Sequence, residues 1–157
     1  SVANVAEWVE NPTVGQLYAG GALTGAWTIA ARAAWGGESI AYLFDSQTGR
    51  VVVGRAAANN GYLVGGAWRS VNLFPDTATY NFFIISDGST VQAYRDNVAI
   101  GSAASATTDI AASGSTRWRS DYTSLGSTWS GSVPRAAIYK IALDATQRAA
   151  LHVSLAA

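Results

Sequence analysis

The stretch from Tyr80 to Gly101 constrains the fold more than any other part of this 157-residue chain. Residues 80–86 are rich in aromatic and β-branched side chains, and their apolar residues fall on both parities, which predicts a strand covered on both faces. Asp87-Gly88 and Asp96-Asn97 are two-residue turn signals, because glycine, Asp and Asn tolerate positive φ. The alternating residues on either side of the second turn predict two further strands. The stretch therefore indicates a three-stranded β-meander.

Short strand patterns bounded by turn residues recur along the rest of the chain. Residues 39–44 and 50–55 predict a hairpin, and Asn59-Asn60-Gly61 predicts another turn. Residues 102–115, built mainly of Ala, Ser, Thr and Gly, are predicted to form a surface loop. Near the end, Asp144 and Gln147 have the spacing of a helix capping box. Together these signals predict an all-β fold, an antiparallel β-sandwich with one short C-terminal helix.

Three motifs in order resemble the laminin-G-like, or concanavalin A-like lectin and glucanase, jelly rolls. They are the meander, the early strand Ala26–Trp35, and the closing segment Trp129–Leu151 with its glycine-led strand and terminal helix. The resemblance implies a jelly roll over residues 22–157, preceded by an N-terminal attachment segment with the first strand or strands at 1–21, within a single domain overall. Most members of this family bind glycans or proteins, and some are structural proteins of bacteriophages.

The composition is poor in charge. Charged residues make up 13% and hydrophobic residues 49% of the chain, and the formal net charge is zero. This gives no basic surface for nucleic acid or for an anionic membrane. A surface with so few charges is weakly protected against self-association, which favours a chain covered by partners or by its own copies. There is no cysteine, no apolar run of membrane-spanning length and no signal-peptide pattern at the start, so secretion is left open.

The acidic residues do not predict a catalytic site. A retaining glucanase needs two carboxyl groups about 5 Å apart, but no two of the ten acidic residues alternate along a strand. His152 is the single histidine, and we expect it to be a helix residue without a catalytic role. One histidine and no cysteine argue against zinc. The resemblance implies that calcium is possible in the loops, with Asp45 and Asp121 as weak candidates; no other cofactor is expected.

The six Trp and seven Tyr residues exceed what one small core needs. Trp, Tyr and Arg are favoured at binding surfaces because they offer a large rigid contact area with a polar end. If Trp118 is buried, strand alternation predicts that the two arginines beside it form an exposed pair. The predicted binding residues are Trp68, Arg69, Arg117, Trp118, Arg119, Tyr122 and Trp129.

These observations predict a non-catalytic binding or structural module. The favoured context is the virion surface of a bacteriophage, as a capsid decoration protein or tail-fibre component that contacts other virion proteins or its own copies, and glycans of the host. The alternative is a carbohydrate-binding module of a secreted bacterial protein. A glucanase-like enzyme is a third, disfavoured interpretation. Neither nucleic acid nor membrane is expected as a partner.

Overall fold

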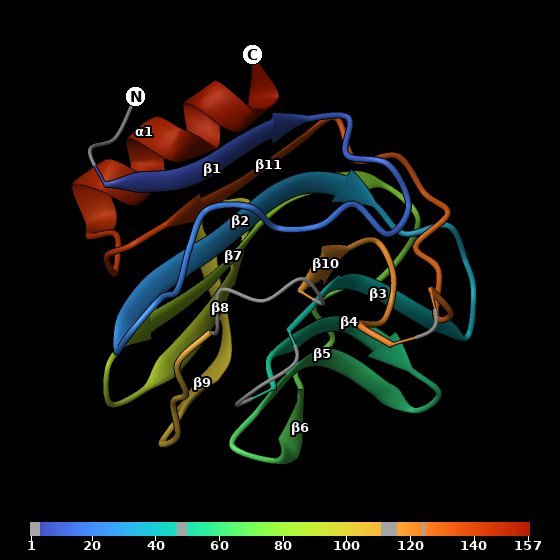
Figure 1. Ribbon diagram of the computed structural model, residues 1–157, viewed down its shortest axis with the longest axis horizontal. Helices are drawn as coiled ribbons and strands as arrows, with labels where there is room; N and C mark the ends of the chain where they lie inside the picture. Colours follow the sequence, from blue (N-terminus) through green and yellow to red (C-terminus); the bar gives the residue numbers. More distant parts are fainter. Residues whose placement is uncertain (1–3, 47–49, 111–115, 124) are drawn as a thin grey trace.

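The computed structural model describes residues 4–46, 50–110, 116–123 and 125–157. Two antiparallel sheets pack face to face, and one C-terminal helix, α1 (Ala145–Ala156), lies on the outer face of the larger sheet (Figure 1). The predicted β-sandwich with a C-terminal helix is confirmed. The six-stranded sheet has the order β1 (Val5–Glu10), β11 (Arg135–Tyr139), β2 (Ala26–Ala34), β7 (Thr79–Asp87), β8 (Val91–Arg95) and β9 (Val98–Ala104). The five-stranded sheet has the order β10 (Arg117–Trp118), β3 (Ile40–Asp45), β4 (Val52–Ala56), β5 (Asn59–Val64) and β6 (Ala67–Ser70).

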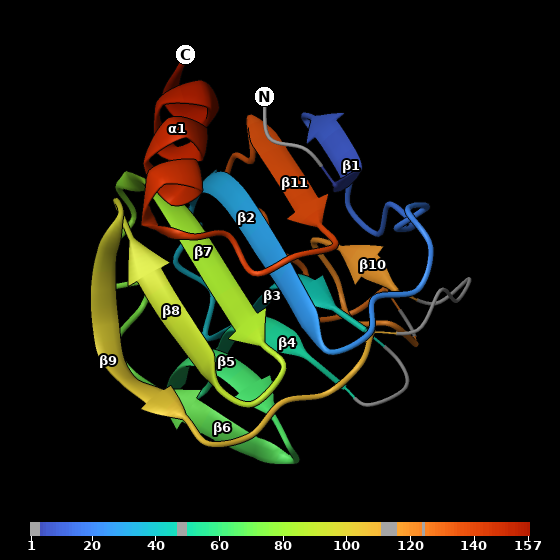
Figure 2. The same ribbon diagram turned by 90° about the vertical axis from the view of Figure 1, so that its left-hand side faces the viewer.

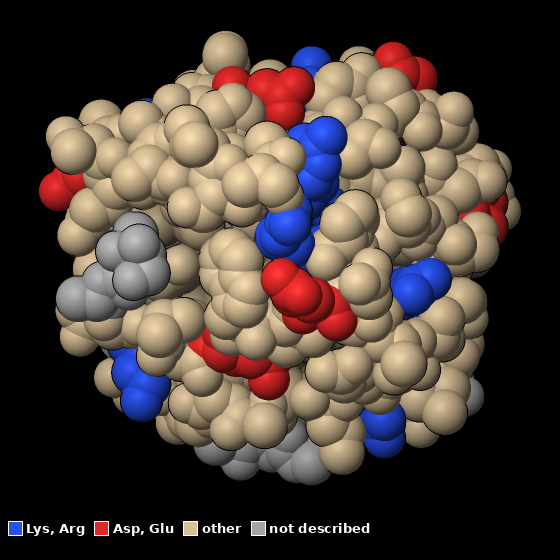
Figure 3. Space-filling view, turned by 90° about the horizontal axis from the view of Figure 1, so that it is seen from above, with Lys and Arg blue, Asp and Glu red and all other residues tan. Residues whose placement is uncertain are grey.

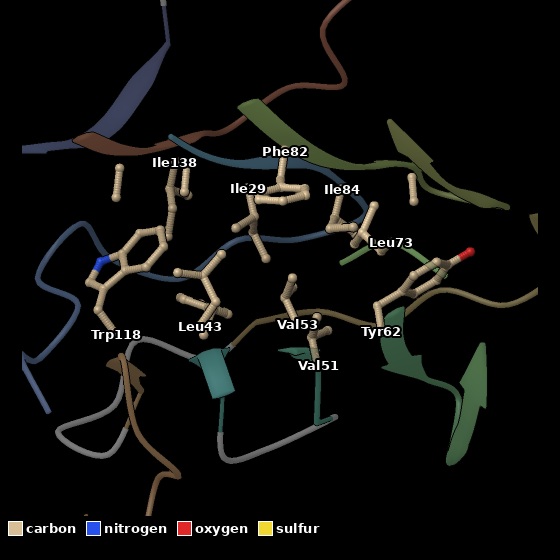
Figure 4. Close-up of a cluster of buried hydrophobic side chains, with 14 of the residues drawn as sticks. Ile29, Leu43, Val51, Val53, Tyr62, Leu73, Phe82, Ile84, Trp118 and Ile138 are labelled. Carbon is tan, nitrogen blue, oxygen red and sulfur yellow. The ribbon is translucent and has the colours of Figure 1, made fainter. Parts of the chain in front are cut away.

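The main core fills the space between the two sheets (Figure 4). Apolar side chains from the inner faces of both sheets meet there, and the removal of their surface from water is the main driving force for folding. Trp118 lies at one end of the cluster and Tyr62 near the other. Both are completely buried, as is Trp27 on β2.

Strand β7 is buried on both faces, as the sequence predicts. Phe82 and Ile84 point into the core between the sheets, whereas Phe83 and Ile85 belong to a second apolar cluster under α1. Because β7 lies between β2 and β8 in the middle of the sheet (Figure 2), it has no solvent-facing side. This explains why its sequence shows apolar residues on both parities.

The predicted meander is confirmed as β7, β8 and β9. At its second turn Asp96 and Asn97 have φ of 48° and 64°, the left-handed values that such a hairpin turn requires. The predicted loop after it begins later than expected, because β9 continues to Ala104. Within the loop Ile110 pairs with Leu23 in an isolated bridge, and residues 111–115 lie outside the described part of the chain.

Helix α1 begins with the predicted capping box. The Asp144 side chain accepts a hydrogen bond from the Gln147 backbone amide at 2.8 Å, and the Gln147 side chain accepts one from the Asp144 amide at 2.9 Å. Leu151 and Leu155 are buried on the helix face that packs against the outer side of the larger sheet. The helix thereby covers apolar side chains that the sheet would otherwise expose.

The turn predicted at Asn59-Asn60-Gly61 is wrong. The chain turns earlier, at residues 57–58, and Asn59 already begins β5. Asn60 is used as a buried hydrogen-bonding group instead: its amide nitrogen donates to Asn72 Oδ1 and Phe74 O, and its Oδ1 accepts from the Phe74 amide. Asn is a common turn residue because its side chain bonds readily to backbone groups. Here Asn60 makes such bonds to a connecting segment and lies in a strand.

Residues 4–20 of the N-terminal segment are integrated into the sandwich. β1 pairs with β11 as the edge strand of the larger sheet, and the Glu7 carboxylate accepts a hydrogen bond at 2.7 Å from Trp118 Nε1 of the smaller sheet. Leu17 forms a bridge with Arg117, so the segment also borders the smaller sheet. The predicted attachment role of residues 1–21 stays a prediction.

The surface is sparsely charged, in keeping with the composition. On the face seen from above, over α1 and β1, acidic and basic side chains form small groups that are separated by wide uncharged areas (Figure 3). None of the helices in the described residues is long and apolar enough to cross a membrane.

Candidate functional site

A bulge in β3 brings two polar residues to the outer face of the smaller sheet. The register shifts between Tyr42, which pairs with Gly54, and Phe44, which pairs with Val53. Leu43 and Phe44 are therefore both buried in the core, although they are consecutive. On either side of them, Tyr42 and Asp45 share the outer face despite being three residues apart.

Tyr42 and Trp68 approach each other over this outer face. Trp68 pairs with Leu63, whose neighbour Tyr62 points into the core, so Trp68 faces outward. The row of Tyr42 continues across the sheet with Gly54 and Gly61, which have no side chains. The two rings lean over these strands, with centroids 6.2 Å apart and planes at 50°.

Asp45 holds the cationic group of the site. Arg50 donates to both carboxylate oxygens, from Nε to Oδ1 at 3.0 Å and from Nη2 to Oδ2 at 2.9 Å, the fork geometry of a strong Arg–carboxylate pair. The Tyr122 amide donates to Oδ2 at 3.0 Å, which ties the loop after β10 to the same carboxylate. The guanidinium carbon lies 5.1 Å from the centroid of the Tyr122 ring and 5.9 Å from that of Tyr42. Asp45 therefore positions both Arg50 and Tyr122.

The electrostatics of the pair follow from burial. Asp45 has no exposed surface, and burial raises the pKa of its carboxyl, against the opposing effect of the Arg50 guanidinium. The hydrogen bonds from Arg50 to Asp45 raise the pKa of Arg50. Burial likewise raises the pKa of the Tyr42 hydroxyl. The neutral phenol can donate and accept hydrogen bonds.

We name the group formed by Tyr42, Asp45, Arg50, Trp68 and Tyr122 the outer-face cluster. Four separate segments of the chain supply it: β3, the connection that leads into β4, β6 and the loop after β10. Its three rings and its arginine are partly exposed, and only the carboxylate is fully buried. The cluster offers apolar ring surface beside polar groups that are already held in place.

Two predicted binding residues, Trp68 and Tyr122, belong to the cluster, and Arg69 does not. Arg69 pairs with Tyr62 and follows it to the inner side of the sheet, because side chains alternate along a strand. The adjacent Trp68 and Arg69 therefore point to opposite faces. They cannot act together on one ligand.

Trp118 and Trp129 are core residues, which corrects their prediction as surface binding residues. Both are completely buried. Trp118 packs edge-on against Phe44 with ring centroids 5.0 Å apart, and Trp129 packs in the same way against Phe74, also at 5.0 Å. Their ring area stabilises the sandwich and does not form a binding surface.

The exposed arginine pair predicted around Trp118 is also absent. Arg117 lies on the face opposite to Trp118, as expected, but its Nη1 donates to the Gly15 carbonyl at 2.8 Å. Arg119 has a φ of 64°, which interrupts the alternation, and its half-buried guanidinium donates to three backbone carbonyls. Burial lowers the pKa of Arg119. The acceptors are the carbonyl oxygens of Pro12, Trp129 and Gly131.

The two calcium candidates are placed differently. Asp45 is occupied by Arg50 and the Tyr122 amide, whereas Asp121 accepts hydrogen bonds from the backbone and hydroxyl of Thr123. In the described ranges of the chain, no three His, Cys, Asp or Glu residues gather in a way that could hold a metal ion. Calcium binding stays a prediction.

Tyr42 and Arg50 are the members of the cluster that the sequence analysis missed. Strand alternation places Tyr42 on the same face as Phe44, and only the bulge reverses this. Arg50 gave no signal beyond its place near the end of a hairpin loop. The pattern that could have drawn attention to both is an aspartate that follows an aromatic strand and precedes an arginine by five residues.

Comparison with known proteins supports the sandwich fold. No family model matches the chain, and no curated protein matches it either. A Trypanosoma rangeli sialidase solved with 2,3-difluorosialic acid matches with a TM-score of 0.55 and 12% identity, over 98% of this chain and 29% of that chain. The same organism's sialidase with 2,3-difluoro-KDN matches with a TM-score of 0.53 and 10% identity, over 98% and 28%. The chain thus spans less than a third of these structures, and the likeness concerns the fold alone.

Proposed function

We propose that this chain is a non-catalytic glycan-binding module on a laminin-G-like, or concanavalin A-like, jelly roll, with the outer-face cluster as its binding site. The observation that carries the proposal is the convergence of Tyr42 and Tyr122 on an arginine that a buried carboxylate holds, with Trp68 beside Tyr42.

The chemistry of the cluster suits a sugar ring. One face of a pyranose presents C–H groups that pack on an aromatic ring, while its hydroxyls need hydrogen-bonding partners nearby. Tyr and Trp provide such surface with few rotatable bonds, so that little side-chain entropy is lost on binding. Because Asp45 already orders Arg50 and the Tyr122 loop, part of the ordering cost precedes binding.

The proposal includes no catalytic step. Asp45 is the carboxylate of the cluster, and its two oxygens face Arg50 and the Tyr122 amide within the protein, where a general acid or nucleophile would face the substrate. The sialidases that resemble this chain are several times longer, and their activity is not carried over.

A glycan array followed by calorimetric titration of the best oligosaccharide tests the proposal. We expect Trp68→Ala and Tyr122→Ala each to weaken binding about tenfold, the change that about 1.4 kcal/mol of lost ring contact produces. Tyr94→Ala is the matched control, because Tyr94 is another half-exposed tyrosine beside an arginine but lies on the other sheet. The Arg148 guanidinium carbon is 4.0 Å from the centroid of the Tyr94 ring. Binding by no glycan, or equal loss in all three variants, would reject the proposal.

A second candidate function is the virion-surface role, in which the chain attaches to other proteins or to its own copies. The exposed apolar side chains near the start of the chain favour it, since exposed apolar surface marks interaction sites. Light scattering at several concentrations, with and without charged substitutions at these positions, tests self-association; a concentration-independent monomer would argue against a self-assembling fibre. The residues are Val5, Trp8, Val14 and Leu17.

A further inference from the structure

We infer that the outer-face cluster selects neutral sugars and discriminates against sugars that carry a carboxylate. The inference rests on the proposed glycan-binding function and concerns the class of glycan. It follows from how the charges of the cluster are already arranged.

The positive charge of the cluster is already paired within the protein. Arg50 directs Nε and Nη2 at the two oxygens of Asp45, so the fork that would bind a ligand carboxylate is occupied. A ligand that drew the guanidinium away would leave Asp45 buried and ionised, with the Tyr122 amide as its remaining donor in the described residues. Such an exchange is unfavourable, because a buried charge needs a partner.

A ligand carboxylate would also meet negative charge. Asp121 lies close enough to Asp45 and Tyr42 to act electrostatically on both. A ligand carboxylate beside Arg50 would add a third acidic group to a region that already holds Asp45 and Asp121. Like charges at such separations repel each other, and water screens them less where they are partly buried.

The same arrangement suits a neutral ring. The Arg50 guanidinium lies near the rings of Tyr42 and Tyr122, and 38% of the Arg50 side chain is exposed. The bonds to Asp45 use Nε and Nη2, which leaves the two N–H groups of Nη1, and one of these can donate to a sugar hydroxyl. The adjacent Trp68 ring offers a face for C–H groups. An uncharged hydroxyl uses this donor without displacing Asp45.

The test is an array of oligosaccharides printed in matched pairs, each neutral chain beside the same chain carrying a sialic or uronic acid, probed with the whole chain at pH 7.5. We expect the neutral member of each bound pair to bind at least tenfold more tightly, with an affinity that changes less than twofold between 0.05 and 0.5 M NaCl, roughly as expected for uncharged contacts. Tighter binding of the acidic members, weakened by salt, would overturn the inference and leave the glycan-binding function intact. Binding of no glycan would reject both.

Variants separate the charge argument from the shape of the site. Asp45→Asn keeps the side chain's size and frees the charge of Arg50, so we expect the ratio of neutral to acidic binding to fall about tenfold. Asp76→Asn is the control, because Asp76 is an exposed carboxylate that bonds to Tyr80 on another part of the surface. If Asp45→Asn unfolds, which circular dichroism would reveal, the salt dependence of the unmodified chain still decides. An unchanged ratio in a folded Asp45→Asn variant would contradict the inference.

Discussion

Asp45 allows a direct test of what the buried ion pair contributes to folding. Asp45→Asn removes the charge and keeps one oxygen, which can still accept from the Tyr122 amide and Arg50 Nη2, while its NH2 group replaces the acceptor of Arg50 Nε. Charged hydrogen bonds contribute about 1.5–3 kcal/mol each, and burial of the charge acts against them. Burial is the largest effect on the pKa of Asp45 and raises it against the hydrogen bonds, so loss of the charge is expected to cost little stability. We expect Asp45→Asn to change the free energy of unfolding by less than about 1 kcal/mol at pH 7.5.

Asp45→Ala is expected to behave differently. It leaves the Tyr122 amide and the arginine fork without an acceptor and opens a small void. An unsatisfied buried donor costs about 1–3 kcal/mol. Arg50 is partly exposed and regains water, which limits its share of the loss. We therefore expect a loss of about 2–3 kcal/mol, measured by urea unfolding with tryptophan fluorescence.

The pH dependence provides an independent check of the sign. The ordinary carboxyl pKa is about 3.9, and the folded value for Asp45 lies above it. Between these two values the folded state binds more protons than the unfolded state, so falling pH stabilises the unmodified chain relative to Asp45→Asn. A loss of more than about 3 kcal/mol in Asp45→Asn at pH 7.5, of the size reported for a broken buried ion pair, would refute this reasoning. The reasoning would also be refuted if the free energy of unfolding of the unmodified chain, relative to that of Asp45→Asn, decreased as the pH is lowered.

Three further substitutions test contacts that hold the sandwich together. Glu7→Ala removes the acceptor of Trp118 Nε1 and should lower the free energy of unfolding, measured by urea titration, by about 1–3 kcal/mol. The control is Glu10→Ala: Glu10 is exposed, and its loss should change this free energy by less than about 0.5 kcal/mol. Arg119→Met removes the donor to three carbonyls and should lower stability by about 2–3 kcal/mol; an unchanged thermal midpoint would show that water replaces the guanidinium. Asp144→Ala removes the capping box and should lower stability by about 1 kcal/mol, while Asp144→Ser, which retains a capping oxygen, should recover most of it.

The sequence predicted those elements whose signals are local. The Asp96-Asn97 turn, the capping box at Asp144 and the two-sided burial of residues 80–86 all depend on neighbouring residues, and all three are confirmed. The predicted hairpin of residues 39–44 and 50–55 is likewise present as β3 and β4. Propensity and alternation suffice where tertiary contacts do not oppose them.

The candidate site was harder to predict because tertiary structure decides which face each aromatic residue takes. A one-residue bulge placed Tyr42 and Phe44 on opposite faces, and alternation separated Trp68 from Arg69. Trp118 and Trp129 have the composition of a binding patch but fill the core. The sequence shows how many aromatic residues the strands carry. It does not show which face of the sheet each one takes, because a register shift changes the direction of every side chain beyond it.

The position of β11 between β1 and β2 has a consequence for synthesis on the ribosome. β1 is made before the other strands, but its pairing partner begins at Arg135, so the 124 residues 11–134 follow β1 before that partner is made. At about 5–20 residues per second this takes about 6–25 s. During that interval Val5 and Trp8 have no sheet to join, whereas the β7–β9 meander can form as soon as it is made. The first strand of this chain is thus among the last to be incorporated, which makes it the segment most open to a chaperone.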